Sequence, residues 1–263
     1  MVRQPSVAAQ RTQEILQELL RTGKVTVDNL AHRLKVSAAT IRRDLAELEH
    51  RGLLRRNHGG AVSIEPALYE PFRHVSSFQE QEEQLSSEKR RIGLAAAEII
   101  SDGETIALGA GTTTTQVARS LRHRKGITVI TNAVNIAMEL SHQDSIKIML
   151  TGGVLSGSWF ALVGPAAIQS VSEFFVDKAF IGVDGIHAEN GLTTNYPDQA
   201  TIHRAMLQQA RQKIVIADHR KIGVAGTALI WPPTGIDLFI TDADAEDKAI
   251  EPFIAKGIKV RLV

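Results

Sequence analysis

A run of small and hydroxylated residues from Gly109 to Thr115 directly follows a short apolar segment and is well suited to bind an anion. Glycines let a backbone approach a ligand closely, and the first turn of the helix that follows directs free N–H groups at it. The threonine hydroxyls add donors, so a dianionic phosphate is the expected ligand. The run lacks the Gly-Lys-Ser/Thr of a P-loop. Taken alone it equally fits an ordinary strand-to-helix turn in which Thr113 and Gln116 form a capping box.

Three further segments of this kind follow other apolar runs, namely Thr131-Asn132, Thr151-Gly152-Gly153 and Asp184-Gly185. In open α/β sheets, ligands bind beyond the carboxyl ends of the strands. The sequence therefore predicts that these three segments and the glycine–threonine run line one crevice.

A second set of residues suited to chemistry is cationic and stands near the start of the chain. Arg42 and Arg43 fall on a helix predicted from Ala38 to about Arg51, with Ser37 placed to cap it. Small residues beside long cationic ones let a helix enter the major groove of DNA, where arginine grips guanine or a phosphate. The alternative is that these arginines form only a solvated surface, which is the usual fate of a charge cluster.

The elements that must position these arginines follow from hydrophobic spacing. Apolar residues recur at helical spacing around Ile15 to Leu19 and again from Val27 to Leu34. A tight turn at Val36-Ser37 separates the second helix from the third, and Leu53 to Val62 predicts two short strands around a glycine turn. Residues 1–64 are therefore predicted to form a winged helix-turn-helix domain.

The charge distribution agrees with this division. Residues 1–64 hold eleven Lys/Arg and six Asp/Glu, a balance of +5, which leaves 19 and 23, a balance of −4, for the rest of the chain. Net charges of opposite sign in the two segments indicate two different functions, and the basic segment is the candidate nucleic-acid binder.

The remainder of the chain is predicted to hold a connector and a larger α/β domain. Residues 65–84 contain Pro66 and Pro71 with little apolar periodicity, which is typical of an interdomain linker. Residues 85–263 alternate strand-like and helical patterns, which predicts an α/β fold with a mainly parallel sheet. The predicted strands are Glu104–Leu108, Thr128–Thr131, Ile146–Leu150, Ala179–Val183, Lys213–Ala217, Leu238–Thr241 and Ile258–Leu262.

The composition excludes several other classes of protein. The 263 residues are 43% hydrophobic and 22% charged, as in globular proteins, and they include no cysteine, so neither a disulfide framework nor a thiolate metal site is possible. No apolar run approaches the ~18 residues that span a bilayer, and the N-terminus lacks an apolar signal core. We expect a soluble cytoplasmic protein with no membrane partner, no metal and no cofactor.

The segments Val36-Ser37-Ala38-Ala39-Thr40-Ile41-Arg42-Arg43-Asp44-Leu45 and Leu48 to Ala61 resemble the signature of DeoR-family repressors. This resemblance implies contacts to double-stranded operator DNA from one set of residues: Ser37, Thr40, Arg42, Arg43, Arg55, Arg56 and His58. Symmetric operators further imply a homo-oligomer that is at least a dimer.

The second part of the chain is similar to the DeoR-family sensor domain, through Lys89, Gly111-Thr112-Thr113-Thr114, Gly152-Gly153 and Asp218 with Lys221 among other matches. That domain is related in fold to ribose-phosphate isomerases, and the resemblance implies a phosphorylated sugar or polyol as effector. The implied effector-binding residues are Gly111, Thr112, Thr113, Thr114, Thr115 and Lys221, then Lys89, Asn132, Gly152, Asp184 and His203. The chain departs from many relatives at Gly109, Gln199 and His203. Because of these departures, the resemblance does not identify which sugar is the effector.

Three functions compete at this stage. A regulator would repress a carbohydrate operon until its effector binds, although an effector acting as co-repressor is also consistent with the residues. An isomerase would need a carboxylate base beside its substrate, but His187 stands where isomerases carry a second acid, and Gln199 leaves Asp198 as the nearest carboxylate in the following segment. A purely architectural DNA binder would leave some two hundred residues without a task. The sequence therefore favours a non-enzymatic regulator.

Overall fold

The computed structural model describes residues 7–50, 53–62 and 76–263. Contacts divide the chain into two compact units, residues 1–70 and 71–263, which are described separately. Among the helices of the described residues, none combines the length and the apolar character needed to cross a membrane.

The first unit has three helices and a small sheet. Helices α1 (Val7–Thr22), α2 (Val27–Leu34) and α3 (Ala38–His50) pack on an antiparallel sheet in the order β1 (Lys24–Thr26), β3 (Gly60–Val62), β2 (Arg55–Asn57). Ile41, Leu45 and Leu48 of α3 are at most 1% exposed, as their helical spacing predicts. The predicted helix-turn-helix and wing are both present, and β1 is a strand that the sequence analysis did not predict.

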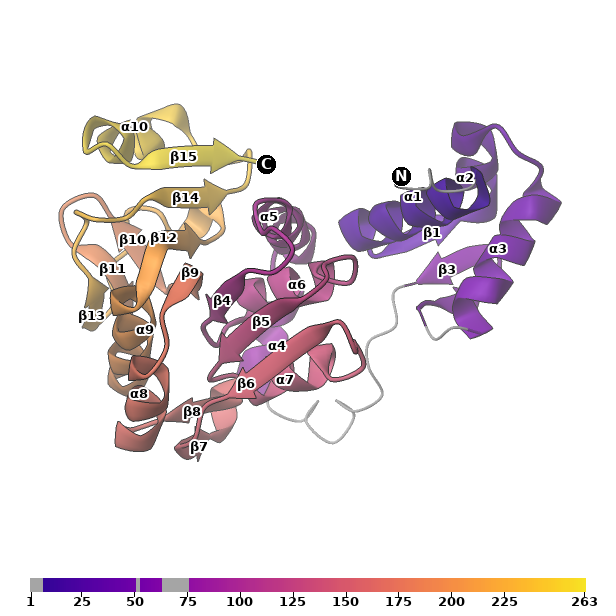
Figure 1. The fold of residues 1–263 in the computed structure, drawn as a ribbon. Coiled ribbons are helices and arrows are strands. Elements are labelled where there is room, and N and C mark those ends of the chain that lie inside the picture. The colour runs from indigo at the N-terminus through magenta and orange to yellow at the C-terminus, as the bar shows by residue number, and fades with distance from the viewer. Residues whose placement is uncertain (1–6, 51–52, 63–75) are drawn as a thin grey trace. The chain divides into compact units, whose positions relative to one another are not determined.

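The second unit is built on a seven-stranded parallel sheet, which confirms the predicted fold class (Figure 1). Each of the seven predicted strands is present, with ends that differ by no more than three residues. In spatial order they are β15 (Lys259–Leu262), β14 (Leu238–Thr241), β12 (Ala210–Ile216), β9 (Val176–Gly182), β4 (Thr105–Leu108), β5 (Ile127–Thr131) and β6 (Ile146–Leu150).

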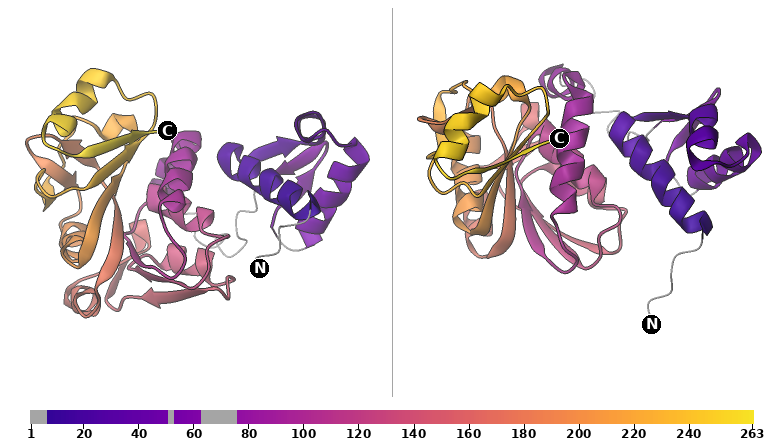
Figure 2. Two further views of the ribbon diagram at one scale, coloured as in Figure 1. Left: turned by 45° about the horizontal axis from the view of Figure 1, so that its top comes forward. Right: turned by 90° about the horizontal axis from the view of Figure 1, so that it is seen from above.

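Helices cover both faces of this sheet (Figures 1 and 2). One face carries α5 (Ser86–Glu98), α6 (Thr112–Ser120) and α7 (Val134–Leu140), and the other carries α8 (Pro165–Ser172), α9 (Pro197–Gln208) and α10 (Asp247–Ala255). The change of face reflects the order of the strands. From β4 the chain moves outward through β5 to β6, and then returns to the other side of β4 as β9. The topological switch point, where ligands bind in such sheets, therefore lies between β4 and β9.

Smaller elements surround the carboxyl ends of the strands. A hairpin of β7 (Val154–Ser156) and β8 (Ala161–Val163) encloses the short helix η2 (Gly157–Trp159). A three-stranded antiparallel sheet is formed by β10 (Gly185–His187), β11 (Gly191–Thr194) and β13 (Ala228–Trp231), and η3 (His219–Lys221) follows β12. The strand-like runs of the sequence did not predict these additions.

Helix α4 (Ser76–Glu83) occupies the second half of the segment that we predicted to be a linker, residues 65–84. Phe78 is 5% exposed, and its ring centroid lies 6.2 Å from that of Trp159 and 5.2 Å from that of Phe160. Glu82 forms an ion pair of 2.8 Å with Arg119 of α6. A single buried aromatic residue produces no repeating apolar pattern in the sequence, so the sequence did not predict a helix here. The first half of the predicted linker, up to residue 75, lies outside the described residues.

Candidate functional site

Helix α3 presents the predicted DNA-contacting side chains at its exposed surface. Ser37 caps the helix, since its Oγ accepts from the backbone N–H of Thr40 at 3.1 Å. Arg42 and Arg43 are exposed and make no ion pair with any described residue. Free guanidinium groups beside small residues are what a DNA groove or phosphate requires.

The wing carries the other predicted contacts. Arg55, Arg56 and His58 are all exposed on or beside β2. The backbone N–H of Arg56 donates to Oε1 of Glu49 at 2.8 Å, which ties the wing to the end of α3. The two predicted basic elements are therefore held on one rigid unit.

A half-buried ion pair joins α3 to α1. Arg11 of α1 donates to both carboxylate oxygens of Asp44, at 2.6 and 3.0 Å. This hydrogen bonding raises the pKa of Arg11. Bidentate arginine–carboxylate pairs are geometrically specific, so the pair sets how α3 is held against α1.

The second unit holds an open pocket of about 530 Å³ at the switch point between β4 and β9. Its lining comes from the carboxyl ends of β4, β9 and β12 together with α4, α5, α6, β11, η2, η3 and the start of α9. The lining residues are Gln81, Lys89, Ala110, Gly111, Thr112, Thr113, Trp159, Gly182, Val183, Asp184, Thr194, Tyr196, Gln199, Ala217, Asp218 and Lys221.

The first turn of α6 forms one wall of this pocket. Gly111 stands at the N-cap position without a side-chain cap, so the first N–H groups of the helix have no partner within it. Thr113 lies inside the helix, and the alternative capping box with Gln116 does not form. Thr114 and Thr115 turn away from the pocket, because their hydroxyls donate to the carbonyl of Gly111 at 2.9 and 2.8 Å. Gly111, Thr112 and Thr113 remain to face a ligand.

Two lysines bring positive charge to the same pocket. Lys221 lies on η3, and Lys89 on α5 is 2% exposed, with its Nζ donating to the carbonyl of Gln81. Burial lowers the pKa of Lys89 to about 8, against a smaller opposing effect of Asp218. A helix N-terminus and two ammonium groups together suit a phosphate.

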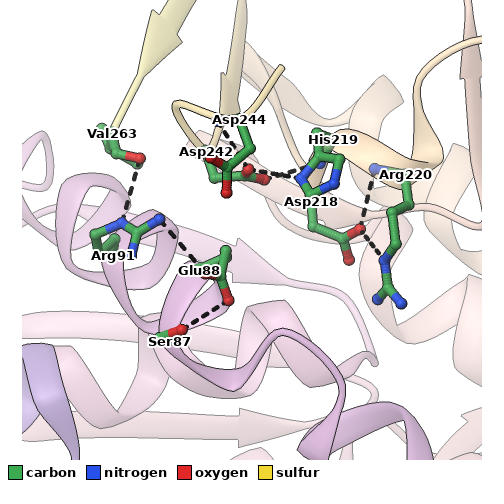
Figure 3. A network of polar contacts seen from close by, with 9 residues as sticks. All are labelled: Ser87, Glu88, Arg91, Asp218, His219, Arg220, Asp242, Asp244 and Val263. Carbon is green, nitrogen blue, oxygen red and sulfur yellow. Dashed lines mark hydrogen bonds and ion pairs between the residues drawn. The ribbon is translucent and has the colours of Figure 1, made fainter. Parts of the chain in front are cut away.

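Two carboxylates also line the pocket, and each already accepts hydrogen bonds. Oδ2 of Asp184 accepts from the hydroxyl of Thr194 at 2.7 Å and from the N–H of Asn195 at 2.9 Å. Oδ1 of Asp218 accepts from Nε of Arg220 at 3.0 Å, as Figure 3 shows.

Besides Thr114 and Thr115, three more predicted effector residues do not line the pocket. Asn132 is fully buried, accepts from the N–H of Ala110 at 3.0 Å and donates to Leu162, so it supports the loop instead of facing a ligand. Gly152 follows β6, the edge strand two places from β4, and lies near Ser170. His203 is 1% exposed behind Gly109. Of the four segments predicted to line one crevice, only the glycine–threonine run and Asp184 line the pocket. Asn132 is instead held by backbone groups, and strand order keeps the end of β6 away from the switch point.

The comparisons with known proteins agree with these two units. Residues 11–67 match the model of the DeoR-like helix-turn-helix domain, and residues 84–243 match that of the DeoR C terminal sensor domain. The HTH-type transcriptional regulator GlpR of Haloferax volcanii is 34% identical over 96% of both chains. The chain belongs to the DeoR family of transcriptional regulators.

Other DeoR-family relatives match over most of their length. The HTH-type transcriptional repressor GlcR of Bacillus subtilis is 37% identical over 89% of this chain and 88% of its own. Among solved structures, ribose 5-phosphate isomerase A of Methanocaldococcus jannaschii aligns with 51% of this chain and 52% of its own, at 20% identity and a TM-score of 0.39. A likeness of that size supports no functional argument.

The pocket of this DeoR-family chain includes residues that the sequence analysis did not assign to it. Gln81 comes from α4, Trp159 from η2, and Tyr196 and Gln199 from the start of α9. The Trp159 and Tyr196 rings lie 5.2 Å apart in an edge-on arrangement and supply an aromatic wall. No spacing rule in the sequence connects these positions, although Gln199 stood out as a departure from relatives.

A polar network next to the pocket holds the ends of β12 and β14 together (Figure 3). Nδ1 of His219 lies 2.7 Å from Oδ1 of the fully buried Asp242, which also accepts from the N–H of Asp244 at 3.2 Å. Possible metal-ligand atoms of these three residues lie within 4.8 Å of one another. Because Asp242 already forms hydrogen bonds with the other two residues, we interpret the group as a structural hydrogen-bond network and not as a metal site.

Proposed function

We propose that this DeoR-family regulator represses an operon of carbohydrate metabolism and is released from its operator by a phosphorylated sugar or polyol. The observation that carries the proposal is the convergence of the α6 N-terminus, Lys89 and Lys221 on one pocket at the switch point. Two relatives, GlcR and the putative aga operon transcriptional repressor of Escherichia coli O157:H7, are likewise named as repressors.

Within this proposal the phosphate lies at the first turn of α6. Gly111, Thr112 and Thr113 offer unpaired N–H groups or hydroxyls, and the two lysines neutralise the dianion. Asp184 and Gln199 then face the rest of the ligand. Operator DNA is bound by α3 and the wing through the seven predicted residues, and a homo-oligomer presents two such units to a symmetric operator.

The alternative is that the pocket isomerises a sugar phosphate. Asp184 and Asp218 are the carboxylates that line it, and Asp218 is held by Arg220. His187 lies outside the pocket lining, where Nδ1 accepts from the N–H of Glu189 at 3.0 Å, and Asp198 is exposed on α9. We therefore propose binding without turnover. Conversion of a pentose or hexose phosphate by the purified chain, abolished by Asp184→Asn, would contradict this.

Thermal unfolding against a panel of sugar phosphates and their unphosphorylated parents tests the effector. A ligand at one hundred times its dissociation constant stabilises the native state by about 2.7 kcal/mol, which raises the melting temperature. We expect a rise with a phosphorylated compound, none with its parent, and loss of operator binding in the same concentration range. If no phosphate compound shifts the melting temperature or the operator affinity, the effector half of the proposal fails.

A further inference from the structure

Helix α9 carries two buried polar side chains whose nitrogens have no partner within the described chain. Gln199 is 7% exposed and His203, one helical turn later, is 1% exposed. Nε2 of Gln199 and both ring nitrogens of His203 lack a hydrogen-bond partner. Buried polar groups are nearly always paired, and an unpaired one costs about 1–3 kcal/mol. Three such atoms in neighbouring positions form a buried polar cluster, and Gln199, which lines the pocket, offers its amide nitrogen to a bound molecule.

The pair lies beside the predicted phosphate loop. Gln199 lines the pocket itself. His203 lies behind Gly109, where a Cβ would come within 2.9 Å of its Nε2. Gly109 directly precedes Ala110 and Gly111, which also line the pocket. Residues i and i+4 share one face of a helix, so α9 offers both side chains on the same side.

The two side chains of α9 carry no charge of their own, although the carboxylate of Asp184 also lines this part of the pocket. The amide of Gln199 is neutral, and burial lowers the pKa of His203 to about 4 against a smaller opposing effect of Asp184, so its ring is uncharged at neutral pH. Together the two side chains offer hydrogen-bond donors and one ring acceptor. Hydroxyl and carbonyl groups match this set, because a hydroxyl both donates and accepts. A carboxylate or second phosphate would be buried here without a dedicated cation, which is costly.

We propose that Gln199, with His203 behind it, forms a neutral subsite that binds the uncharged hydroxyl or carbonyl groups of the effector. The subsite selects monophosphates of neutral sugars or polyols over ligands that carry a second anionic group. This inference rests on the proposed function, because it assumes that a phosphate occupies the first turn of α6.

Titration calorimetry on the full chain tests the subsite with defined probes. Ribose 5-phosphate, glucose 6-phosphate and fructose 6-phosphate are neutral beyond the phosphate. Gluconate 6-phosphate and fructose 1,6-bisphosphate carry an added negative charge, and inorganic phosphate probes the phosphate end alone. Glucosamine 6-phosphate carries an added positive charge and serves as the probe for a Gln199→Glu variant. We expect the tightest neutral sugar phosphate to bind about tenfold or more tightly than its anionic counterparts, which is the selectivity that one or two hydrogen bonds supply.

Substitutions at Gln199 assign this selectivity to the subsite. Gln199→Leu removes the amide and should weaken the neutral probe about tenfold. Gln199→Glu has nearly the same shape and should shift preference toward glucosamine 6-phosphate. Gln208, exposed on the same helix, provides the matched controls Gln208→Leu and Gln208→Glu, which should retain wild-type selectivity. Melting curves without ligand verify that each variant is folded.

The outcomes separate the two proposals. If anionic and neutral probes bind the wild type equally well, or if both Gln199 variants keep wild-type selectivity, the neutral subsite is refuted while the phosphate site stands. If neither inorganic phosphate nor any sugar phosphate binds the wild type, the proposed effector is wrong and the subsite falls with it.

Discussion

The ammonium of Lys89 is buried against the carbonyl of Gln81, and this burial makes ligand binding depend on pH. Its pKa of about 8 in the free protein lies below the ordinary lysine value of 10.5. A dianionic ligand favours the charged ammonium, so binding raises this pKa and takes up a proton near pH 8. Affinity for a phosphate ligand should therefore fall as the pH rises above about 8, approaching about tenfold per pH unit.

Calorimetry at pH 8 in two buffers of different ionisation enthalpy measures this proton uptake directly. Lys89→Met should abolish the uptake and weaken binding. Lys248→Met removes an exposed lysine of α10 and serves as the matched control. Binding without proton uptake at pH 8 would place the phosphate away from Lys89.

His203 makes the stability of the second unit depend on pH in the acid range. Its pKa is about 4 in the folded chain and about 6.5 when exposed in the unfolded chain. Between these values the unfolded state binds more protons, so the free energy of unfolding falls as the pH drops from 6.5 toward 4. The full loss below pH 4 is on the order of 3 kcal/mol.

The variant His203→Gln has no group that titrates in this range. Urea unfolding at pH 7 and pH 5 should show a smaller loss of stability for the variant than for the wild type. His142→Gln, which replaces an exposed histidine, is the control. An equal loss in wild type and His203→Gln would contradict a buried neutral ring.

At the level of single elements, α3 depends on exposed arginine side chains for its proposed role. Arg43→Ala should abolish specific operator binding and leave the melting temperature nearly unchanged, since Arg43 is exposed and unpaired among the described residues. Arg43→Lys keeps the charge but loses the two-pronged donor geometry. Mobility shifts on DNA sequences selected from a random pool measure both variants.

The two variants distinguish phosphate contacts from base contacts. If Arg43→Lys keeps the wild-type preference for operator over other DNA, Arg43 contacts a phosphate. If Arg43→Lys binds DNA but no longer prefers the operator sequence, Arg43 contacts a base. Wild-type operator affinity in Arg43→Ala would refute α3 as the recognition helix.

Helices α5 and α6 form the second pair of elements that matters for the site. Gly93 lets them pack closely, because a Cβ there would meet the backbone and Cβ of Gln116 at 2.6 Å. Gly93 lies one turn after Lys89, so the spacing of the helices also sets the distance from this lysine to the first turn of α6. Gly93→Ala should destabilise the unit by about 1–3 kcal/mol and weaken phosphate binding.

Denaturant unfolding and calorimetry with a phosphate ligand measure the two effects. Gly103→Ala is a useful comparison. Gly103 has a φ of +83° but open space around it, so its substitution strains a turn without moving α5. If Gly93→Ala is destabilised but binds phosphate as tightly as the wild type, the spacing of α5 and α6 does not determine phosphate affinity.

On the scale of the whole molecule, α4 is the first described element after residues 63–75, and it also reaches the pocket. Gln81 lines the pocket, Phe78 packs on Trp159 and Phe160, and Glu82 pairs with Arg119. A ligand that contacts Lys89 or Trp159 therefore acts on groups that hold α4. Phe78→Ala should leave an effector able to bind but reduce its effect on operator affinity.

Linkage makes this prediction quantitative. The factor by which effector lowers operator affinity must equal the factor by which operator lowers effector affinity. Both factors should shrink together in Phe78→Ala and stay at the wild-type value in Glu80→Ala, which alters an exposed position of the same helix. Unchanged factors in Phe78→Ala would show that α4 takes no part in the coupling.

Local spacing in the sequence was sufficient to predict α2, α3, the wing, the seven parallel strands and the glycine–threonine run. Each of these depends on residues close together in the chain, where period and capping chemistry are direct signals. Spacing did not predict α4, in which Phe78 is the one buried apolar side chain among the described residues, or the β7–β8 hairpin with Trp159.

The composition of the pocket depends on contacts between residues far apart in the chain. The order of the strands places β4 beside β9, so Gly111 and Asp184 meet while Gly152, after the edge strand β6, stays apart. The same packing brings Gln81 and Gln199 to one cavity and buries His203 with no hydrogen-bond partner among the described residues. A single sequence records which strands exist. Which strands become neighbours is set by how the helices cover the two faces, and that follows only when the whole core is packed.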